Sequence, residues 1–124
     1  MIFDAGFLIS IDRGEGSARN LLTALHRSQT PLHTTHPVVA QAWRSGPSQA
    51  RLASFLQTVT VHPLDDGRAL GQILALTRTS DVVDAHLVVV AVRLGDPILT
   101  GGPDDLNHLA DTLGTAAPTI HAWP

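Results

Sequence analysis

The sequence predicts an α/β domain with a mainly parallel central sheet. Three observations support this prediction. Short β-branched or apolar segments alternate with helical segments along the chain. The length of 124 residues fits one compact domain, and a hydrophobic content of 44% with 15% charged residues is sufficient for a core. We therefore expect residues 1–124 to form a single domain without internal repeats or linkers.

The first half of the chain is predicted to alternate strands with helices whose ends are marked by Ser, Thr, Gly and Pro. The helical segments carry leucine or phenylalanine at helical spacing, which gives each an apolar stripe. In chain order, the expected elements are a strand at 2–3 leading through Asp4 into a helix, a helix at 18–27 capped by Ser17, a strand at 32–34, a helix at 37–44 capped by Thr35 or His36, and a helix at 49–57 capped by Ser48.

The second half repeats the alternation. Its longest helix is rich in Ala, Val and Leu, so we expect that helix to be central and mostly buried. In chain order, the expected elements are a strand at 59–62, a helix at 66–77, the central helix at 81–94 capped by Ser80, a strand at 98–100, a helix at 104–112 and a strand at 119–121.

Composition excludes several function classes. The absence of cysteine rules out disulfides, thiolate zinc sites and a cysteine nucleophile. All eight basic residues are arginine, which rules out chemistry that needs a lysine amine, such as Walker-type phosphate binding, Schiff bases and phospho-aspartyl receivers. No apolar run is long enough to span a bilayer and no basic stretch opens the chain, so we expect a cytoplasmic protein without a membrane partner.

Aspartates follow two of the predicted strands. Asp4 comes directly after the first strand, and Asp104 and Asp105 follow the strand at 98–100 after a glycine-rich turn. Asp81 and Asp84 are three residues apart at the start of the central helix, so they share one helix face. Sites in parallel α/β sheets form beyond the carboxyl ends of the strands. These carboxylates are therefore expected to converge in one pocket if the central helix begins at the same edge.

Converging carboxylates repel one another unless a cation neutralises them. With no cysteine available, oxygen ligands favour Mg²⁺ or Mn²⁺, and such an ion suits phosphodiester hydrolysis because it activates water and stabilises phosphoryl charge. Each acid also has a structural explanation. Asp4 can cap the following helix, Asp81 and Asp84 can interact with a helix N-terminus, and Asp104 and Asp105 can stabilise a turn.

Other catalytic arrangements are disfavoured. The seven histidines show no close pair on a helix face with an acid between them, and His33 and His36 fall in a loop-like stretch, which disfavours a histidine metal site. His86 is expected to point away from Asp84 on the central helix. No Gly-x-Ser-x-Gly elbow is present, so a serine hydrolase is also disfavoured.

Four stretches distributed over most of the chain resemble the PIN-domain family, and in particular the VapC-like toxins of bacterial toxin–antitoxin pairs. They are IFDAGFLI at 2–9, HPVVAQAWR at 36–44, DVVDAH at 81–86 and LTGGPDDL at 99–106. Each stretch alone is weakly specific, whereas their order along the chain is fairly specific. The resemblance implies a three-layer α/β/α sandwich with a mainly parallel central sheet.

The resemblance also implies a metal-dependent endoribonuclease that hydrolyses RNA with Mg²⁺ or Mn²⁺. In its pattern the catalytic and metal-binding acids are Asp4, Asp84 and Asp105, with Asp81 as a further metal ligand and Thr100 as a strand-end hydroxyl near the metal. An antitoxin protein and a homodimeric state come with the family.

Two positions depart from the family pattern. Gln41 stands where a glutamate is usual, and Gly102 stands where an acid is frequent, so up to two negative charges are missing. Gln41 and Asp104 remain candidate supporting residues, and Arg44 is a candidate contact for an RNA phosphate. Fewer carboxylates mean weaker divalent-ion binding. The alternative is therefore a catalytically degenerate PIN-like module that binds a partner protein or RNA without cleaving it.

Overall fold

A five-stranded parallel sheet forms the centre of the computed structural model, which describes residues 1–79 and 81–124. The strands lie in the order β3-β2-β1-β4-β5, and each neighbouring pair is parallel. Their bounds are β1 Ile2–Phe3, β2 His33–Thr35, β3 Thr60–His62, β4 Ile98–Thr100 and β5 Ile120–Ala122. The predicted parallel sheet is confirmed, with each strand within two residues of its expected position.

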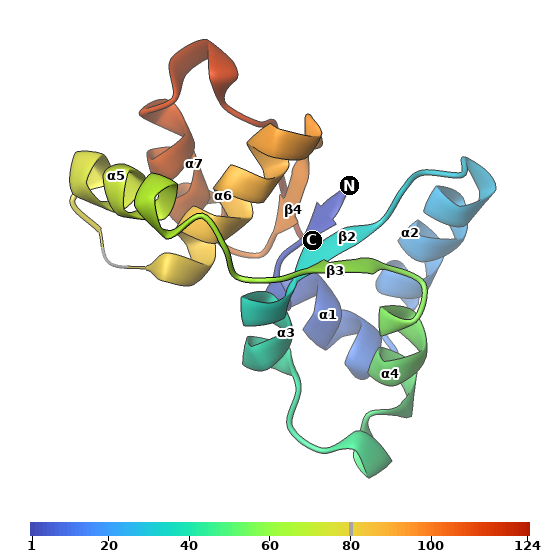
Figure 1. The fold of residues 1–124 in the computed structure, drawn as a ribbon. Helices are drawn as coiled ribbons and strands as arrows, with labels where there is room; N and C mark the ends of the chain where they lie inside the picture. Colours follow the sequence, from blue (N-terminus) through green and yellow to red (C-terminus); the bar gives the residue numbers. More distant parts are fainter. Residues whose placement is uncertain (80) are drawn as a thin grey trace.

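Helices cover both faces of this sheet (Figure 1). The first four lie on one face and the last three on the other, which gives the expected three layers. Their bounds are α1 Ala5–Asp12, α2 Gly16–Arg27, α3 His36–Ala42, α4 Ala50–Leu56, α5 Gly67–Thr77, α6 Val82–Leu94 and α7 Pro103–Asp111, with 3₁₀ turns at Gly46–Ser48 and Gly114–Ala116. Within the described residues, none of these helices has the length and apolar character needed to span a bilayer.

The core forms where the two central strands contact both helical layers. The side chains of β1 and β4 are buried, as expected for strands covered on both faces. On one face Phe3, Phe7 and Phe55 form an aromatic cluster with ring centroids 4.5–5.8 Å apart. This cluster fixes α1 against the sheet, so the residue between β1 and α1 has a defined position.

Two predicted helix caps are wrong. Ser17 lies inside α2, because the helix already begins after Glu15, whose carbonyl accepts from the amide of Arg19 at 3.2 Å. Ser48 belongs to a 3₁₀ turn, and its hydroxyl donates to the carbonyl of Ser45 at 3.2 Å instead of capping α4. One helix thus begins earlier than the sequence pattern indicated, and the other begins later because a turn precedes it.

The Thr35 alternative is confirmed, because its hydroxyl accepts from the Val38 amide at 3.3 Å at the start of α3. Ser80 lies outside the described residues, and Asp81 occupies the N-cap of α6. The loop expected around His33 and His36 is wrong, since the first lies in β2 and the second begins α3.

A buried amide organises the connection between α3 and α4. The side-chain oxygen of Gln49 accepts from the amides of Arg44 and Ser45 at 2.7 and 2.8 Å. Its nitrogen donates to the carbonyl of Ala42 at 3.0 Å and to the Asp12 carboxylate at 3.3 Å. Since Gln49 is only 6% exposed, water cannot replace these bonds easily.

We expect Gln49→Ala to lower the free energy of unfolding by about 2–3 kcal/mol, because it leaves one buried and two partly buried backbone groups without their partner. Urea unfolding followed by circular dichroism measures the change. Gln57→Ala, at the exposed end of α4, is the matched control and is expected to change stability by less than about 0.5 kcal/mol. Equal effects of the two substitutions would contradict the role assigned to Gln49.

Candidate functional site

The strand order reverses direction between β1 and β4. From β1 the chain continues to β2 on one side, whereas from β4 it continues to β5 on the other. The connections leaving the carboxyl ends of these two strands therefore diverge, which is where α/β sheets form their sites. Asp4 follows β1 and Thr100 ends β4, so both lie at this point.

Asp4 is held by a short chain of hydrogen bonds. The buried Thr100 hydroxyl donates to one Asp4 carboxylate oxygen at 2.7 Å and accepts from the Gly102 amide at 2.9 Å. The other Asp4 oxygen accepts from the Ala5 amide at 2.7 Å, so Asp4 also caps α1. The capping explanation is thus correct, and it does not remove Asp4 from the site, because the cap fixes the direction of the carboxylate.

Two glycines allow α1 to begin this close to the turn after β4. A Cβ atom on Gly6 would lie 3.3 Å from the backbone nitrogen of Gly101, which is tighter than most real contacts of this kind. A Cβ atom on Gly101 would lie 3.5 Å from the carbonyl oxygen of Trp123. The sequence motif around Asp4 therefore has a packing reason: small residues bring Asp4 within hydrogen-bonding distance of Thr100.

The starts of α6 and α7 border a hollow of about 380 Å³, which we call the acidic hollow. Three of its lining residues are aspartates. The lining residues are Thr79, Asp81, Asp84, Asp105, His108 and Leu109. Asp81 caps α6 by accepting from the Asp84 amide at 3.0 Å, which orders this rim of the hollow.

Asp84 has the most perturbed electrostatics in this region. Its pKa is raised from 3.8 to about 7, first by burial and then by the charges of Asp81, Asp4 and Asp105 and a hydrogen bond with Asp81. These four acids come from the end of β1, the start of α6 and the start of α7. The charges of Asp81, Asp4 and Asp105 therefore all act on Asp84, and their mutual repulsion makes this region receptive to positive charge.

Asp4 and Thr100 lie at the ends of β1 and β4 and are not among the lining residues of the acidic hollow. Three further candidates do not line it either, within the part of the chain that the structure describes. Gln41 is exposed on α3, and Asp104 is exposed in the first turn of α7. The Arg44 guanidinium donates to the carbonyl oxygens of Ala40 and Trp43 at 3.0 and 2.7 Å, so it caps the end of α3.

His108 is a site residue that the sequence pattern did not single out. It lines the acidic hollow, and its Nε2 lies 3.0 Å from the carbonyl oxygen of Thr77 at the end of α5. The signal that could have identified it is its spacing of three residues from Asp105, which places both on neighbouring positions of one helix face.

Comparison with known proteins supports the fold. No protein-family model matches the chain, and no curated protein sequence matches it. Twelve chains of solved structures match, among them one from the crystal structure of VapBC2 from Rickettsia felis bound to a DNA fragment from its promoter. That match covers 100% of both chains with a TM-score of 0.68 and 13% sequence identity. The fold is PIN-like.

The region around Asp4 and the acidic hollow offers the ligands that a hard divalent cation prefers, because its polar groups are mainly carboxylate and hydroxyl oxygens. As placed, however, no three Asp, Glu, His or Cys side chains among residues 1–79 and 81–124 form a group that could hold a metal ion. Donor type and charge therefore fit Mg²⁺ or Mn²⁺, whereas a preformed cage of three side chains is not present in this part of the chain.

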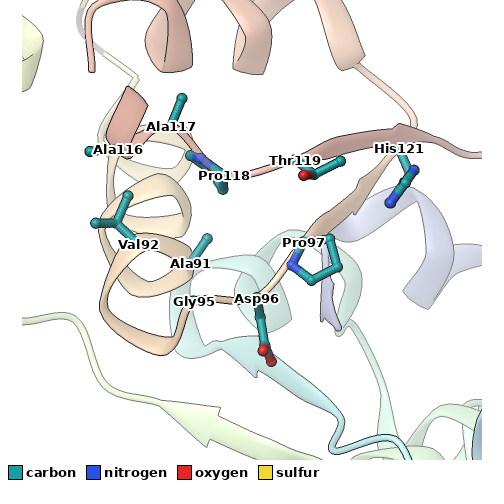
Figure 2. Close-up of a pocket in the computed structure, with 10 residues that line it drawn as sticks. All are labelled: Ala91, Val92, Gly95, Asp96, Pro97, Ala116, Ala117, Pro118, Thr119 and His121. Atoms are coloured by element: carbon teal, nitrogen blue, oxygen red, sulfur yellow. The ribbon is translucent and has the colours of Figure 1, made fainter. Parts of the chain in front are cut away.

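A second hollow, of about 280 Å³, lies near the amino ends of β4 and β5 (Figure 2). Its residues belong to the segments 91–97 and 116–121. The Asp96 carboxylate points away from Ala117 and Pro118 in Figure 2, and it accepts from the Met1 amine at 3.0 Å. The charge of Asp96 is thus already neutralised. This second hollow also lies at the opposite edge of the sheet from Asp4. The acidic hollow is therefore the better candidate for chemistry.

Proposed function

We propose that this protein is a VapC-like, metal-dependent endoribonuclease that hydrolyses RNA phosphodiester bonds at the acidic hollow. The observation that carries the proposal is the state of Asp84, whose pKa is raised to about 7 by burial and by three neighbouring aspartates at the divergence of β1 and β4. Such a concentration of negative charge disfavours an apolar or anionic ligand and favours a divalent cation.

Three aspartates of this chain have distinct proposed roles. Asp4 presents a carboxylate whose direction is fixed by Thr100 and by the Ala5 amide. Asp84 and Asp105 would hold a cation with carboxylates from α6 and α7, and a bound cation would favour the deprotonated form of Asp84, whose pKa is raised to about 7. When bound, Mg²⁺ or Mn²⁺ supplies an activated water and stabilises charge on the phosphoryl group.

Because no three side chains of residues 1–79 and 81–124 form a ready metal cage, we propose that substrate takes part in cation binding. Gln41 is exposed and Gly102 adds no carboxylate, so the four acids Asp4, Asp81, Asp84 and Asp105 provide the charge. RNA phosphate oxygens and water are expected to complete the coordination shell. Activity should therefore need a higher metal concentration than a site with the usual acids.

RNA cleavage with the purified protein tests this function. We expect cleavage in Mn²⁺ or Mg²⁺, none in EDTA, and loss of both metal binding and cleavage in Asp4→Asn. Calorimetric titration of Mn²⁺ measures binding independently of cleavage. Cleavage that persists in EDTA, or that Asp4→Asn leaves intact, would contradict the proposed chemistry.

The second candidate is a PIN-like module that binds RNA or a partner protein without cleaving it. The observation that favours it is the lack of a three-ligand group among the described residues, together with Gln41 and Gly102 in place of acids. Tight RNA binding with no cleavage at any concentration of Mn²⁺ or Mg²⁺ would support this module over the nuclease.

We also propose an antitoxin partner and a homodimer. An apolar groove of about 260 Å³ between α1, α2 and α4 supports a protein partner, because Arg19 and Arg51 line it beside Ile11, Leu22 and Phe55. The first 58 residues carry five arginines and three acids, whereas the rest carry three arginines and eight acids. The groove therefore fits a segment that combines apolar and acidic side chains.

Sedimentation velocity of the isolated protein tests the proposed homodimer.

A further inference from the structure

Two histidines connect β2 and β3. The Nδ1 atom of His33 lies 3.0 Å from the Nε2 atom of His62, and the two ring centroids are 5.1 Å apart. In the strand register His33 is opposite Thr60, so His62 is its diagonal neighbour on the same face of the sheet. A hydrogen bond across this pair needs a proton on one nitrogen and a lone pair on the other.

β3 is a short edge strand that pairs only with β2. It has three residues. Its first residue, Thr60, is exposed, and the other two are only partly buried. Short edge strands of this kind have low local stability, so one side-chain contact between the strands is a significant part of what holds them together.

The surroundings of His33 offer little free negative charge. Its Nε2 lies 3.7 Å from an Asp96 carboxylate oxygen, and the same oxygen lies 3.0 Å from the Met1 amine. The amine therefore already neutralises the carboxylate that faces this ring. Burial, the neighbouring His62 and the Met1 amine lower the pKa of His33, while Asp96 opposes that change.

His62 has a similar environment on its other side. Burial, Arg93 and His86 lower its pKa, while Asp65 opposes the change. Arg93 binds both carboxylate oxygens of Asp65 at 3.3 Å, so this acid is also already paired. Neither ring therefore has an uncommitted carboxylate that would stabilise a positive charge.

We propose that the contact between His33 and His62 is a pH-sensitive contact, which holds β3 on the sheet while at least one ring is neutral and releases it once both rings are protonated. A single proton can be shared as N–H⁺···N. With two protons, both facing nitrogens are donors, no acceptor remains, and two like charges face each other about 3 Å apart.

The direction of the pH effect follows from the two lowered pKa values. An unfolded histidine has a pKa of 6.5, and both folded rings lie below that value. The loss of stability from protonating the two rings therefore begins as the pH falls below 6.5, and it is complete below the pKa values of the folded protein. The segment after β3 stays attached, because Arg93 lowers the pKa of Asp65 and keeps that ion pair charged in mild acid.

Amide hydrogen exchange by NMR tests the proposal. The Thr60 amide donates to the Leu32 carbonyl at 2.9 Å and reports on β3, while the Ile2 amide donates to the Pro97 carbonyl at 2.9 Å and reports on the central sheet. Between pH 7.5 and 4.5, with intrinsic rates corrected, we expect protection of Thr60 to fall at least tenfold more than protection of Ile2. His62→Gln should abolish this difference, because glutamine keeps an acceptor and gains no charge.

His36→Gln is the matched control, since His36 is exposed and only three residues from His33. It should retain the full acid response. If His62→Gln does not fold, His33→Gln and ring ¹⁵N titration of the unmodified protein decide: release of Thr60 must follow the second protonation of the pair. Equal loss of protection at Thr60 and Ile2, or an unchanged acid response in a folded His62→Gln or His33→Gln protein, would overturn the proposal.

Discussion

Asp84→Asn is expected to lower kcat/KM for RNA cleavage at least about 100-fold, the largest effect of any substitution considered. Asparagine keeps the size of the side chain and removes the carboxylate, whose negative charge burial and three neighbouring acids make unfavourable unless a cation is bound. A fluorogenic oligoribonucleotide in Mn²⁺ measures the loss. The substitution also removes a proposed metal ligand without opening a cavity, so the folded state should persist.

Asp111→Asn is the matched control for charge. Asp111 is exposed at the end of α7 and does not line the acidic hollow, yet its substitution changes the net charge by the same amount. We expect activity within about threefold of the unmodified protein, because a distant exposed charge is screened by salt. Similar losses in the two variants would mean that Asp84 acts only through overall charge, and the assigned site would be wrong.

The sheet was predictable from the sequence because each strand is a short apolar or β-branched segment with a helix after it. The position of Asp4 was predictable for the same reason, since a residue after a parallel strand must lie at its carboxyl edge. Both are consequences of topology, and they need no knowledge of side-chain contacts. Thr100 was indicated only by the resemblance to the PIN-domain family, and its hydrogen bond with Asp4 was not predicted.

The features that the sequence could not provide depend on tertiary packing. Gln49 is far from Asp12 in sequence, and the bond between them forms only because α1 packs beside α4. His108 contributes to the acidic hollow because the end of α5 lies against α7. The raised pKa of Asp84 likewise depends on burial and on acids from three elements. The residue types allow each of these interactions, but the interactions form only because the fold brings the partners together.

Removal of the Asp84 charge should also stabilise the metal-free protein at alkaline pH. A group whose folded pKa is raised above its unfolded value binds more protons in the native state, so its contribution to stability falls as the pH rises from about 4 through 7. A rise in the pKa of Asp84 from 3.8 to about 7 corresponds to about 4 kcal/mol, and solvent screening of this half-exposed carboxyl reduces the expected effect to about 1–2 kcal/mol.

Urea unfolding of the metal-free protein at several pH values tests this prediction. At pH 8 we expect Asp84→Asn to unfold at a higher urea concentration than the unmodified protein, with the difference disappearing toward pH 4.

Mg²⁺ should stabilise the unmodified protein more than the variant, because a ligand that binds only the folded state raises its stability. A variant that is less stable at pH 8, or a difference that does not depend on pH, would show that Asp84 is not held against neighbouring negative charge. A bound cation would relieve the repulsion between Asp84 and the neighbouring acids. The carboxylate that destabilises the metal-free protein is therefore the one that cation binding and activity should require.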